Sequence, residues 1–440
     1  MSSNQQPEKY TFITSFGKIS AFKEENVIKA KNIRYARSER FKKPIPLDYA
    51  ENFISDKTPV CPQKISPLLE RLIGKTDIEK FQPEESTQFL SITRPANLVE
   101  QKLPVIVWIH GGSYEIGCGD LPTSDPSVWV QEQNIIVVSV SYRLGLFGFL
   151  GGNDERPANL GLFDIIEALK WIKKYIHDFG GDPDTITLFG QSSGGDAVAH
   201  LLISEGADYL FNRVIIQSAP LGFRLKREKM YTDLFSQTDF LKNDNDVMKM
   251  VDCYQNFLPS SLKYGLKAAM PFCLKYGHEP LPEENTSLET WKKSAPKIDV
   301  LIGFNEDETA FYVKTAQEGL YTYLPEKILN RIVKITTKSI YGKPAEVFAD
   351  NYASGGGKIH LYKLKSTLKN HFIGASHCFD LPLIFANRDA WKEAGLLNNV
   401  PWEYIFENGK KLRSVWAEFA RTGKISDSRD RPEILEIRKI

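Results

Sequence analysis

Short apolar runs alternate with helical segments along most of this 440-residue chain, and this alternation constrains its fold more than any other feature. Several runs have Val, Ile or Leu at consecutive positions, as strands do when both of their faces are covered. Between them, residues 163–176 place a broad apolar stripe beside lysines at helical spacing. Strands and helices in alternation predict an α/β fold, with a mostly parallel sheet between two layers of helices. The predicted strands are Pro104–Ile109, Ile135–Tyr142, Ile186–Phe189, Val214–Gln217, Val300–Gly303 and Ile359–Leu364.

Two regions depart from this pattern. The first ninety residues predict short strands at Thr11–Phe22 and Val27–Ile33, with Gly17 at a turn, and these strands suit an antiparallel edge of the sheet. Residues 224–298 mix charged helical segments with proline-rich loops, which predicts an insertion or cap over the sheet. We therefore expect residues 1–440 to form one domain that carries this insertion.

Composition and cysteine usage exclude several classes of protein. With 42% hydrophobic and 25% charged residues, the chain is able to bury a large core, and disorder is excluded. A net charge of +1 provides no basic surface of the kind that nucleic acid selects. The polar N-terminus lacks a signal-peptide pattern, and the most apolar run is too short to cross a bilayer. Five scattered cysteines lack the spacing of a metal or redox site and predict reduced thiols in the cytoplasm: Cys61, Cys118, Cys253, Cys273 and Cys378.

The sharpest local motif is Gly190-Gln-Ser-Ser-Gly-Gly195, which follows a predicted strand and precedes apolar residues at helical spacing. In a G-x-S-x-G elbow the central serine lies on a strained turn, and the glycines let neighbouring backbone come close without a Cβ clash. A bare five-residue match also describes an ordinary turn, but here the strand and the helix stand where the elbow needs them. Ser192 is therefore the candidate nucleophile, because Ser193 lacks glycines at the required spacing.

A serine hydroxyl becomes a strong nucleophile only when a base removes its proton, so a histidine should follow at a later strand end. His371 and His377 both lie in the loop after the last predicted strand. We favour His377, because residues 374–376 form a compact turn before it and Asp380 is close enough to be an outer hydrogen-bond partner. The other histidines beyond the oxyanion segment fall in helices, in a strand or in the predicted cap, where structural roles are expected: His177, His200, His278 and His360.

The strand 300–305 runs directly into three acids, Glu306, Asp307 and Glu308. Such a cluster also suits a solvated loop, and spacing alone does not choose among the three. The order serine, acid, histidine is nevertheless that of the α/β-hydrolases.

An acyl-transfer site also needs hydrogen-bond donors for an oxyanion. The strand that ends at His110 runs into Gly111, Gly112 and Ser113, whose backbone N–H groups are able to point inward and to act together with that of Ser193. A simple glycine turn with His110 as a packing residue is the alternative interpretation.

Longer motifs in a fixed order extend the match well beyond the elbow. They are Ser141–Leu150, Asn159–Asp164, Phe179–Pro183, Phe189–Gly195 and Ile216–Ser218, with Cys61–Gln63 and Trp416–Gly423 near the ends. On these residues the chain resembles the type B carboxylesterases, which include cholinesterases and bacterial p-nitrobenzyl esterases, over nearly its whole length. The resemblance implies an α/β-hydrolase fold and the hydrolysis of small-molecule carboxylic esters without a metal or other cofactor.

The resemblance also implies roles for individual residues. It selects Glu308 and His377 as the partners of Ser192. It implies an oxyanion hole formed by backbone N–H groups from Gly111–Ser113, chiefly Gly112 and Ser113, and from Ser193. Supporting positions next to the site are Gln191, Ser218 and Asp380, and Arg40 and Glu85 fall where the family often has a structural ion pair.

Several positions depart from the family pattern. Gln191 stands where glutamate is usual, which argues against a site for cationic choline esters. Thr87 replaces the cysteine that would pair with Cys61 in secreted members, which agrees with a cytoplasmic location. Ser113 and Cys378 replace smaller residues and are expected to narrow the site, while a short stretch between Glu308 and His377 predicts a reduced cap and an open pocket.

A serine hydrolase that works through an acyl-enzyme is therefore the function that the sequence predicts. One alternative is a non-catalytic interaction protein, because the family includes adhesion members that have lost the serine. A second is an amide or carbamate hydrolase that uses the same three residues. The sequence makes no prediction of the oligomeric state.

Overall fold

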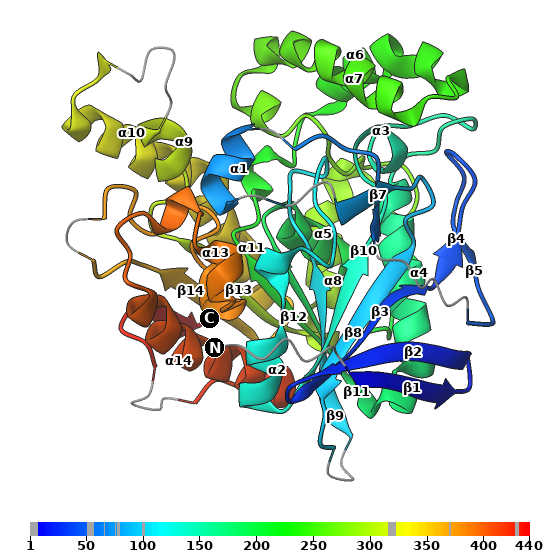
Figure 1. Ribbon diagram of the computed structural model, residues 1–440. Helices are drawn as coiled ribbons and strands as arrows, with labels where there is room; N and C mark the ends of the chain where they lie inside the picture. Colours follow the sequence, from blue (N-terminus) through cyan, green and yellow to red (C-terminus); the bar gives the residue numbers. More distant parts are fainter. Residues whose placement is uncertain are drawn as a thin grey trace.

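The structure is a computed structural model, and it describes residues 8–50, 57–65, 67–74, 76, 80–98, 102–315, 323–368, 371–426 and 431–440. Its centre is a mixed sheet of 11 strands with helices on both faces (Figure 1). In spatial order these strands are β1 (Glu8–Thr14), β2 (Gly17–Glu24), β3 (Val27–Arg34), β8 (Phe89–Pro95), β10 (Ile136–Ser141), β9 (Leu103–Ile109), β11 (Gly181–Gln191), β12 (Arg213–Gln217), β13 (Asp299–Asn305), β14 (Ile359–Leu364) and β15 (Leu435–Lys439).

The six strands from β10 to β14 run parallel, and antiparallel strands flank them on both sides. On one side lie β1, β2, β3 and β8, so the antiparallel N-terminal edge is confirmed and extended by β8. On the other side β15 pairs antiparallel with β14. Two small sheets pair β4 (Ala36–Arg37) with β5 (Ile45–Pro46) and β6 (Thr58–Val60) with β7 (Phe81–Pro83).

The α-helices connect these strands and cover the sheet. They are α1 (Pro67–Ile73), α2 (Ser127–Gln133), α3 (Gly145–Gly148), α4 (Leu160–Tyr175), α5 (Ser193–Leu201), α6 (Glu228–Thr238), α7 (Val247–Phe257), α8 (Ser287–Ser294), α9 (Ala310–Lys314), α10 (Glu326–Thr337), α11 (Lys343–Ser354), α12 (Leu381–Ile384), α13 (Arg388–Trp391) and α14 (Trp402–Thr422). A π-helical turn, Lys338–Gly342, joins α10 to α11.

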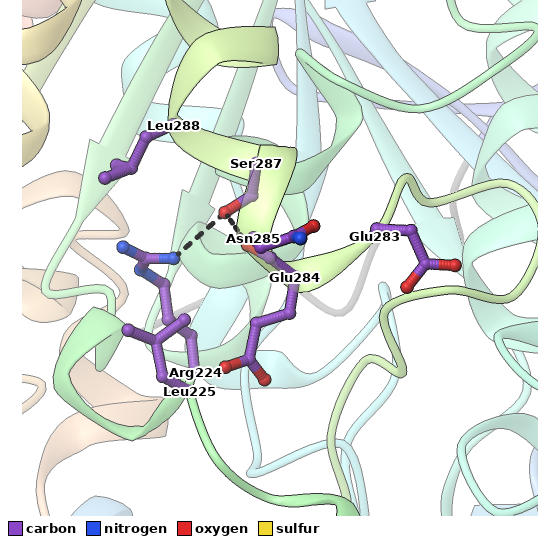
Figure 2. Close-up of a pocket in the computed structure, with 7 residues that line it drawn as sticks. All are labelled: Arg224, Leu225, Glu283, Glu284, Asn285, Ser287 and Leu288. Atoms are coloured by element: carbon purple, nitrogen blue, oxygen red, sulfur yellow. Dashed lines mark hydrogen bonds between the residues drawn. The ribbon is translucent and has the colours of Figure 1, made fainter.

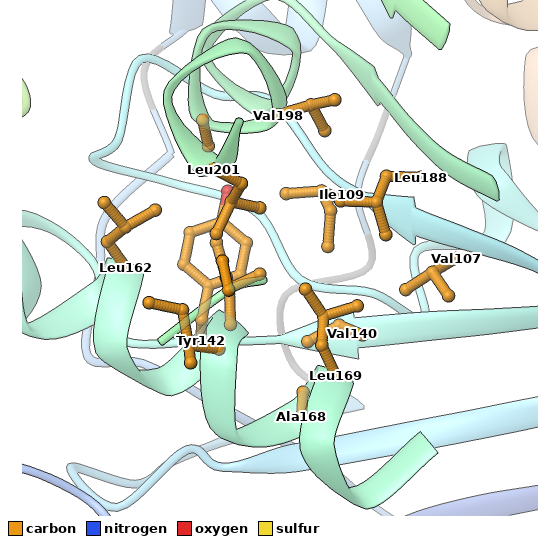
Figure 3. Close-up of a cluster of buried hydrophobic side chains, with 14 of the residues drawn as sticks. Val107, Ile109, Val140, Tyr142, Leu162, Ala168, Leu169, Leu188, Val198 and Leu201 are labelled. Carbon is orange, nitrogen blue, oxygen red and sulfur yellow. The ribbon is translucent and has the colours of Figure 1, made fainter. Parts of the chain in front are cut away.

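Strand β9 is buried on both faces, as its continuous apolar sequence predicts. Val107 and Ile109 point to the side of α4 and α5, while Ile106 and Trp108 point to the side of α2 and α14. Figure 3 shows the first of these clusters, in which side chains of β9, β10 and β11 meet those of α4 and α5. Complete burial of each such aliphatic side chain stabilises the fold by about 1.5–3 kcal/mol, so the centre of the sheet is a rigid base for the loops at its edge.

The predicted insertion, 224–298, divides into two parts. Helices α6 and α7 lie together at the top of the molecule (Figure 1), away from the centre of the sheet. Helix α8 packs instead against α11 in the core layer, and Trp291 donates its indole N–H to Ala199 O in α5 at 2.7 Å. The chain between β13 and β14 forms a second group of helices, α9 to α11, which was not predicted from the sequence.

Within the described part of the chain, no helix combines the length and the apolar character that crossing a membrane requires.

Candidate active site

Strand β11 ends at Gln191, helix α5 begins at Ser193, and Ser192 forms the turn between them. Ser192 has φ 58° and ψ −128°, a conformation that is rare for a residue with a side chain. A Cβ on Gly194 would lie 2.1 Å from Ile109 O, so only glycine allows α5 to approach β9 this closely. The motif thus folds into the sharp elbow that its residues predict, with the side chain of Ser192 partly exposed.

The register of the parallel strands brings the next strand ends level with the elbow. Gln191 is opposite Gln217, and Gln217 is opposite Gly303. Two backbone hydrogen bonds continue this register beyond the strands: Ser192 N–H donates to Gln217 O, and Ser218 N–H donates to Gly303 O, both at 2.9 Å. The serine and the loop after β13 are therefore fixed to one another through backbone.

Three side chains from distant parts of the chain form one line of hydrogen bonds. His377 Nε2 lies 2.8 Å from Ser192 Oγ, and His377 Nδ1 lies 2.6 Å from Glu308 Oε2. Because a carboxylate only accepts, the proton belongs on Nδ1, which leaves Nε2 free to accept from the serine. His377 and Glu308 are 3% and 0% exposed, so water does not compete for these bonds.

Backbone contacts hold the acid and the histidine in place. The second oxygen of Glu308, Oε1, accepts from Asn305 N–H at 2.8 Å, and Glu308 O accepts from His377 N–H at 2.9 Å. Of the other two acids after β13, Glu306 pairs with Lys363 at 3.1 Å. Burial and the charge of Glu306 raise the pKa of the Asp307 carboxyl group. The structure therefore brings Glu308, and neither neighbour, to the histidine.

The alternative histidine, His371, packs its ring against Phe379 with centroids 5.7 Å apart.

Asp380 differs from the expectation, because its carboxylate does not bond to His377. Its partners are the side-chain amides of Gln217 and of Asn305, the latter at 3.5 Å. These amide donors satisfy the buried carboxylate, so it supports the site through Asn305, which also holds Glu308. Burial, followed by the charge of Glu308, raises the pKa of Asp380 to about 6.

The segment after β9 forms a tight turn beside the elbow, which we call the oxyanion turn, Gly111–Tyr114. Gly112 has φ 110° and Ser113 has φ 59°. Among the described residues, the backbone N–H groups of Gly112, Ser113 and Ser193 donate to no protein acceptor. They are thus available to donate to a ligand, and the turn lies close to the nucleophile, since a Cβ on Gly111 would lie 3.0 Å from Ser192 Cβ. His110 is buried and stacks on Tyr142 at 4.4 Å, and burial lowers its pKa to about 4.

Two residues that depart from the family pattern, Gln191 and Cys378, are the chain neighbours of Ser192 and His377 and contact one another. Gln191 Nε2 lies 3.6 Å from Cys378 Sγ, and both side chains are buried, so an uncharged pair stands next to the nucleophile. Cys61 is a free thiol whose sulfur accepts from Leu144 N–H at 3.2 Å. The hydroxyl of Ser218 is buried without a partner among the described residues.

Two tyrosines that the sequence analysis did not single out face the histidine. The ring centroids of Tyr341 and Tyr312 lie 5.4 Å and 6.3 Å from that of His377. Tyr341 comes from the π-helical turn and Tyr312 from α9. Tyr312 follows Glu308 by only four residues, so the sequence itself places it near the acid, whereas Tyr341 has no such local signal.

Arg40 and Glu85 form a bidentate pair with N–O distances of 2.7 and 2.6 Å. Arg40 also donates to the carbonyl oxygen of Asp244, which precedes α7. The ion pair thus anchors the cap helices to the N-terminal part of the chain. No three His, Cys, Asp or Glu side chains in the described ranges lie together in a way that would hold a metal ion.

Comparison with known proteins identifies the family of the chain. The model of the carboxylesterase family matches residues 13–322. A "Probable N-octanoylanthranilate hydrolase" of Rhodococcus erythropolis is 32% identical over 410 residues, which cover 90% of this chain and 89% of that protein. The para-nitrobenzyl esterase of Bacillus subtilis is 28% identical, with 94% and 90% covered. The solved structure of a thermophilic para-nitrobenzyl esterase has a TM-score of 0.80 at 26% identity and covers 98% of this chain and 97% of its own. The chain therefore belongs to the carboxylesterase family, has the α/β-hydrolase fold and is a carboxylic-ester hydrolase.

Proposed function

We propose that the protein hydrolyses small-molecule carboxylic esters through an acyl-enzyme formed on Ser192, with His377 as general base and acid and Glu308 as the residue that orients it. The observation that carries this proposal is the unbroken line from Ser192 Oγ through both nitrogens of His377 to Glu308, at 2.8 and 2.6 Å. The family match supports the ester as the bond that is cleaved.

In the first stage His377 Nε2 takes the hydroxyl proton of Ser192 while Oγ attacks the ester carbonyl carbon. The carbonyl electrons move to oxygen, and the backbone N–H groups of Gly112, Ser113 and Ser193 stabilise this charge. His377 then gives its proton to the departing alkoxide, which leaves as an alcohol. Donors in such a hole each contribute on the order of 10²–10³ in kcat.

In the second stage water replaces the alcohol. His377 removes a proton from the water, the hydroxide attacks the acyl carbon, and the second tetrahedral intermediate expels Ser192 Oγ. The serine recovers its proton from His377, and the carboxylic acid leaves. Throughout, Glu308 accepts from Nδ1 and stabilises the imidazolium form in both stages. This chemistry requires only side chains, backbone and water.

The direct test is hydrolysis of a chromogenic short-chain ester by the wild type and by Ser192→Ala. We expect the variant to lose at least about 10³ in kcat while its thermal unfolding remains close to that of the wild type. Ser193→Ala keeps Ser192 and its own backbone N–H, so a fluorophosphonate should still label it, although it loses the hydroxyl that accepts from Tyr114 N–H. Turnover by Ser192→Ala at the wild-type rate would exclude Ser192.

A second candidate is hydrolysis of amides, which needs the same three residues. It is favoured by the relative from Rhodococcus erythropolis, whose name is that of a hydrolase acting on an N-acyl compound. Comparison of kcat/KM for an acyl ester and the matching N-acyl anilide distinguishes the two. A non-catalytic interaction protein would fail to react with a fluorophosphonate, which labels only an activated serine.

A further inference from the structure

Tyr114, the last residue of the oxyanion turn, is tied to the nucleophile helix α5 at two points. Its backbone N–H donates to Ser193 Oγ at 3.2 Å, and its hydroxyl donates to Asp196 Oδ2 at 2.7 Å. All three residues are buried, with exposed fractions of 0% for Tyr114 and Ser193 and 3% for Asp196. These bonds join the turn that carries two proposed oxyanion donors to the helix that carries the third.

The turn depends on such contacts because its backbone is strained. Ser113 and Tyr114 have φ 59° and 60°, in the left-handed region that residues with a Cβ rarely adopt. Strained turns persist only where the surrounding structure holds them. Here the carbonyl of Tyr114 accepts from Gly145 N–H at 2.6 Å, and its ring packs on Phe149 with centroids 4.2 Å apart. Tyr114 is thus held at its N–H, its carbonyl, its ring and its hydroxyl.

Asp196 is supported from the opposite direction by a chain of polar groups. His200, one turn later in α5, places Nδ1 2.7 Å from Asp196 O and Nε2 2.7 Å from the hydroxyl of Tyr276. Since a carbonyl only accepts, Nδ1 carries the proton and Tyr276 donates to Nε2. Burial lowers the pKa of His200, which agrees with a neutral ring. Tyr276 in turn interacts with Arg224 and Ser287, which line a surface pocket shown in Figure 2.

We propose that Tyr114 and Asp196 are positioning residues that hold the oxyanion turn against α5. In this role they keep the proposed oxyanion donors directed at one point beside Ser192 Oγ. The inference rests on the proposed function, since the position of these donors matters only if an oxyanion forms there. A donor acts fully only at hydrogen-bond distance from the developing charge, so a small displacement of the turn lowers the rate.

The experiment compares Tyr114→Phe, Asp196→Ala and the double variant, with kcat expressed per active site after titration with an organophosphate. Each single variant should lose about 10- to 100-fold in kcat, with KM changed less than about threefold. The double variant should lose little more, because both changes break the same bond. Affinity for a trifluoromethyl ketone, which becomes an oxyanion in the hole, should fall by the same factor as kcat/KM.

Two further variants separate positioning from a general loss of structure. Asp196→Asn retains an oxygen that accepts from Tyr114, and it should keep kcat within about threefold of the wild type. Tyr35→Phe removes another buried hydroxyl, one that donates to Ser141 O at 2.9 Å and not to the turn or to α5, and should leave kcat unchanged.

The proposal is overturned if Tyr114→Phe stays within about twofold of the wild-type kcat, if Tyr35→Phe loses as much, or if Asp196→Asn falls as far as Asp196→Ala. A wild type that neither hydrolyses the ester nor reacts with the organophosphate would instead refute the proposed function. The two failures are therefore distinguishable.

Discussion

The two halves of the candidate site are built differently: Ser192 and Gly194 lie where backbone packs against backbone, whereas the carboxylate of Glu308 and the imidazole of His377 are oriented by hydrogen bonds of their side chains. In the nucleophile half, Ser192 N–H bonds to the backbone of β12, and Gly194 lies against the carbonyl of Ile109. In the acid–base half, Glu308 uses one oxygen for a backbone N–H and the other for the imidazole.

This difference predicts how each half fails. The nucleophile half has no room for an added atom, and apart from the serine hydroxyl its side chains act by holding backbone in place, as proposed above for Tyr114 and Asp196. The acid–base half has room for a substitution that preserves shape, but it depends on which of its atoms donate hydrogen bonds and which accept them. Substitutions of one atom or a few atoms in each half therefore test the distinction.

The largest effect is expected for Gly194→Ala. Its Cβ would meet Ile109 O at 2.1 Å and His110 O at 2.6 Å, and neither backbone oxygen is able to move without displacing β9. We expect a loss of more than about 4 kcal/mol in stability, seen as a low soluble yield, a lower Tm and no fluorophosphonate labelling. Gly356→Ala is the control, because that glycine has φ 85° but open space around it, and it should cost about 1 kcal/mol without loss of kcat. A well-folded Gly194→Ala enzyme would contradict the steric argument.

Glu308→Gln preserves shape and changes chemistry. One side-chain oxygen becomes an NH₂ group, so either Asn305 N–H or His377 Nδ1–H then faces a donor. We expect kcat to fall by about 10²–10⁴ through the wrong tautomer of the histidine, with a much smaller change in Tm than for Gly194→Ala. Glu306→Gln, whose carboxylate pairs with Lys363 near the surface, should leave kcat unchanged. A loss of less than about tenfold for Glu308→Gln would show that the orientation of the imidazole does not depend on this carboxylate.

The two halves also differ in how far the sequence predicts them. The residues of the elbow are contiguous in sequence, and its glycines are required because a Cβ would clash with neighbouring backbone. Its strand, turn and helix are therefore predictable from residues 186–202 alone. The acid–base half joins residues 69 positions apart, and three adjacent acids make its local sequence ambiguous. Only the register of β12, β13 and β14, together with the turn after Asn305, selects Glu308, and here the family resemblance supplied what periodicity did not.

Strand β8 shows a related limit in the fold. It is buried throughout, yet its sequence, Phe-Leu-Ser-Ile-Thr-Arg-Pro, contains polar residues and was not predicted as a strand. The partners that make this burial possible come from elsewhere in the chain: Ser91 donates to Asp120 at 2.5 Å, and the guanidinium of Arg94 lies over the ring of Phe12 at 4.9 Å. Tyr341 was missed for the same reason, since its place over His377 depends on the π-helical turn that carries it.

Asp380 joins the two halves, because it accepts from Gln217 at the end of β12 and from Asn305 at the end of β13. Burial and the charge of Glu308 raise its pKa from the ordinary 3.8 to about 6, so the folded protein binds this proton more tightly than the unfolded chain does. As pH rises from about 4 to above 6, the unfolded state loses the proton first, and the wild type therefore loses up to about 3 kcal/mol of stability from this group.

Asp380→Asn removes this titration. Its one side-chain oxygen accepts from one of the two amides, and its NH₂ group faces the other amide at a cost that does not change with pH, so the variant gives the smallest and most specific test. We expect the free energy of unfolding of the variant, relative to the wild type, to rise by about 2–3 kcal/mol between pH 4 and pH 7 in urea titrations. Asp184→Asn, at an aspartate whose side chain is 82% exposed, should show a difference that does not change with pH in this way. A flat or falling difference for Asp380→Asn would mean that the carboxylate is ionised in the folded protein at pH 4, held by its two amide donors more strongly than burial and Glu308 oppose it. The contact between the halves would then be an ionic hydrogen-bonded link, and the acid–base half would depend on charge as well as on its pattern of donors and acceptors.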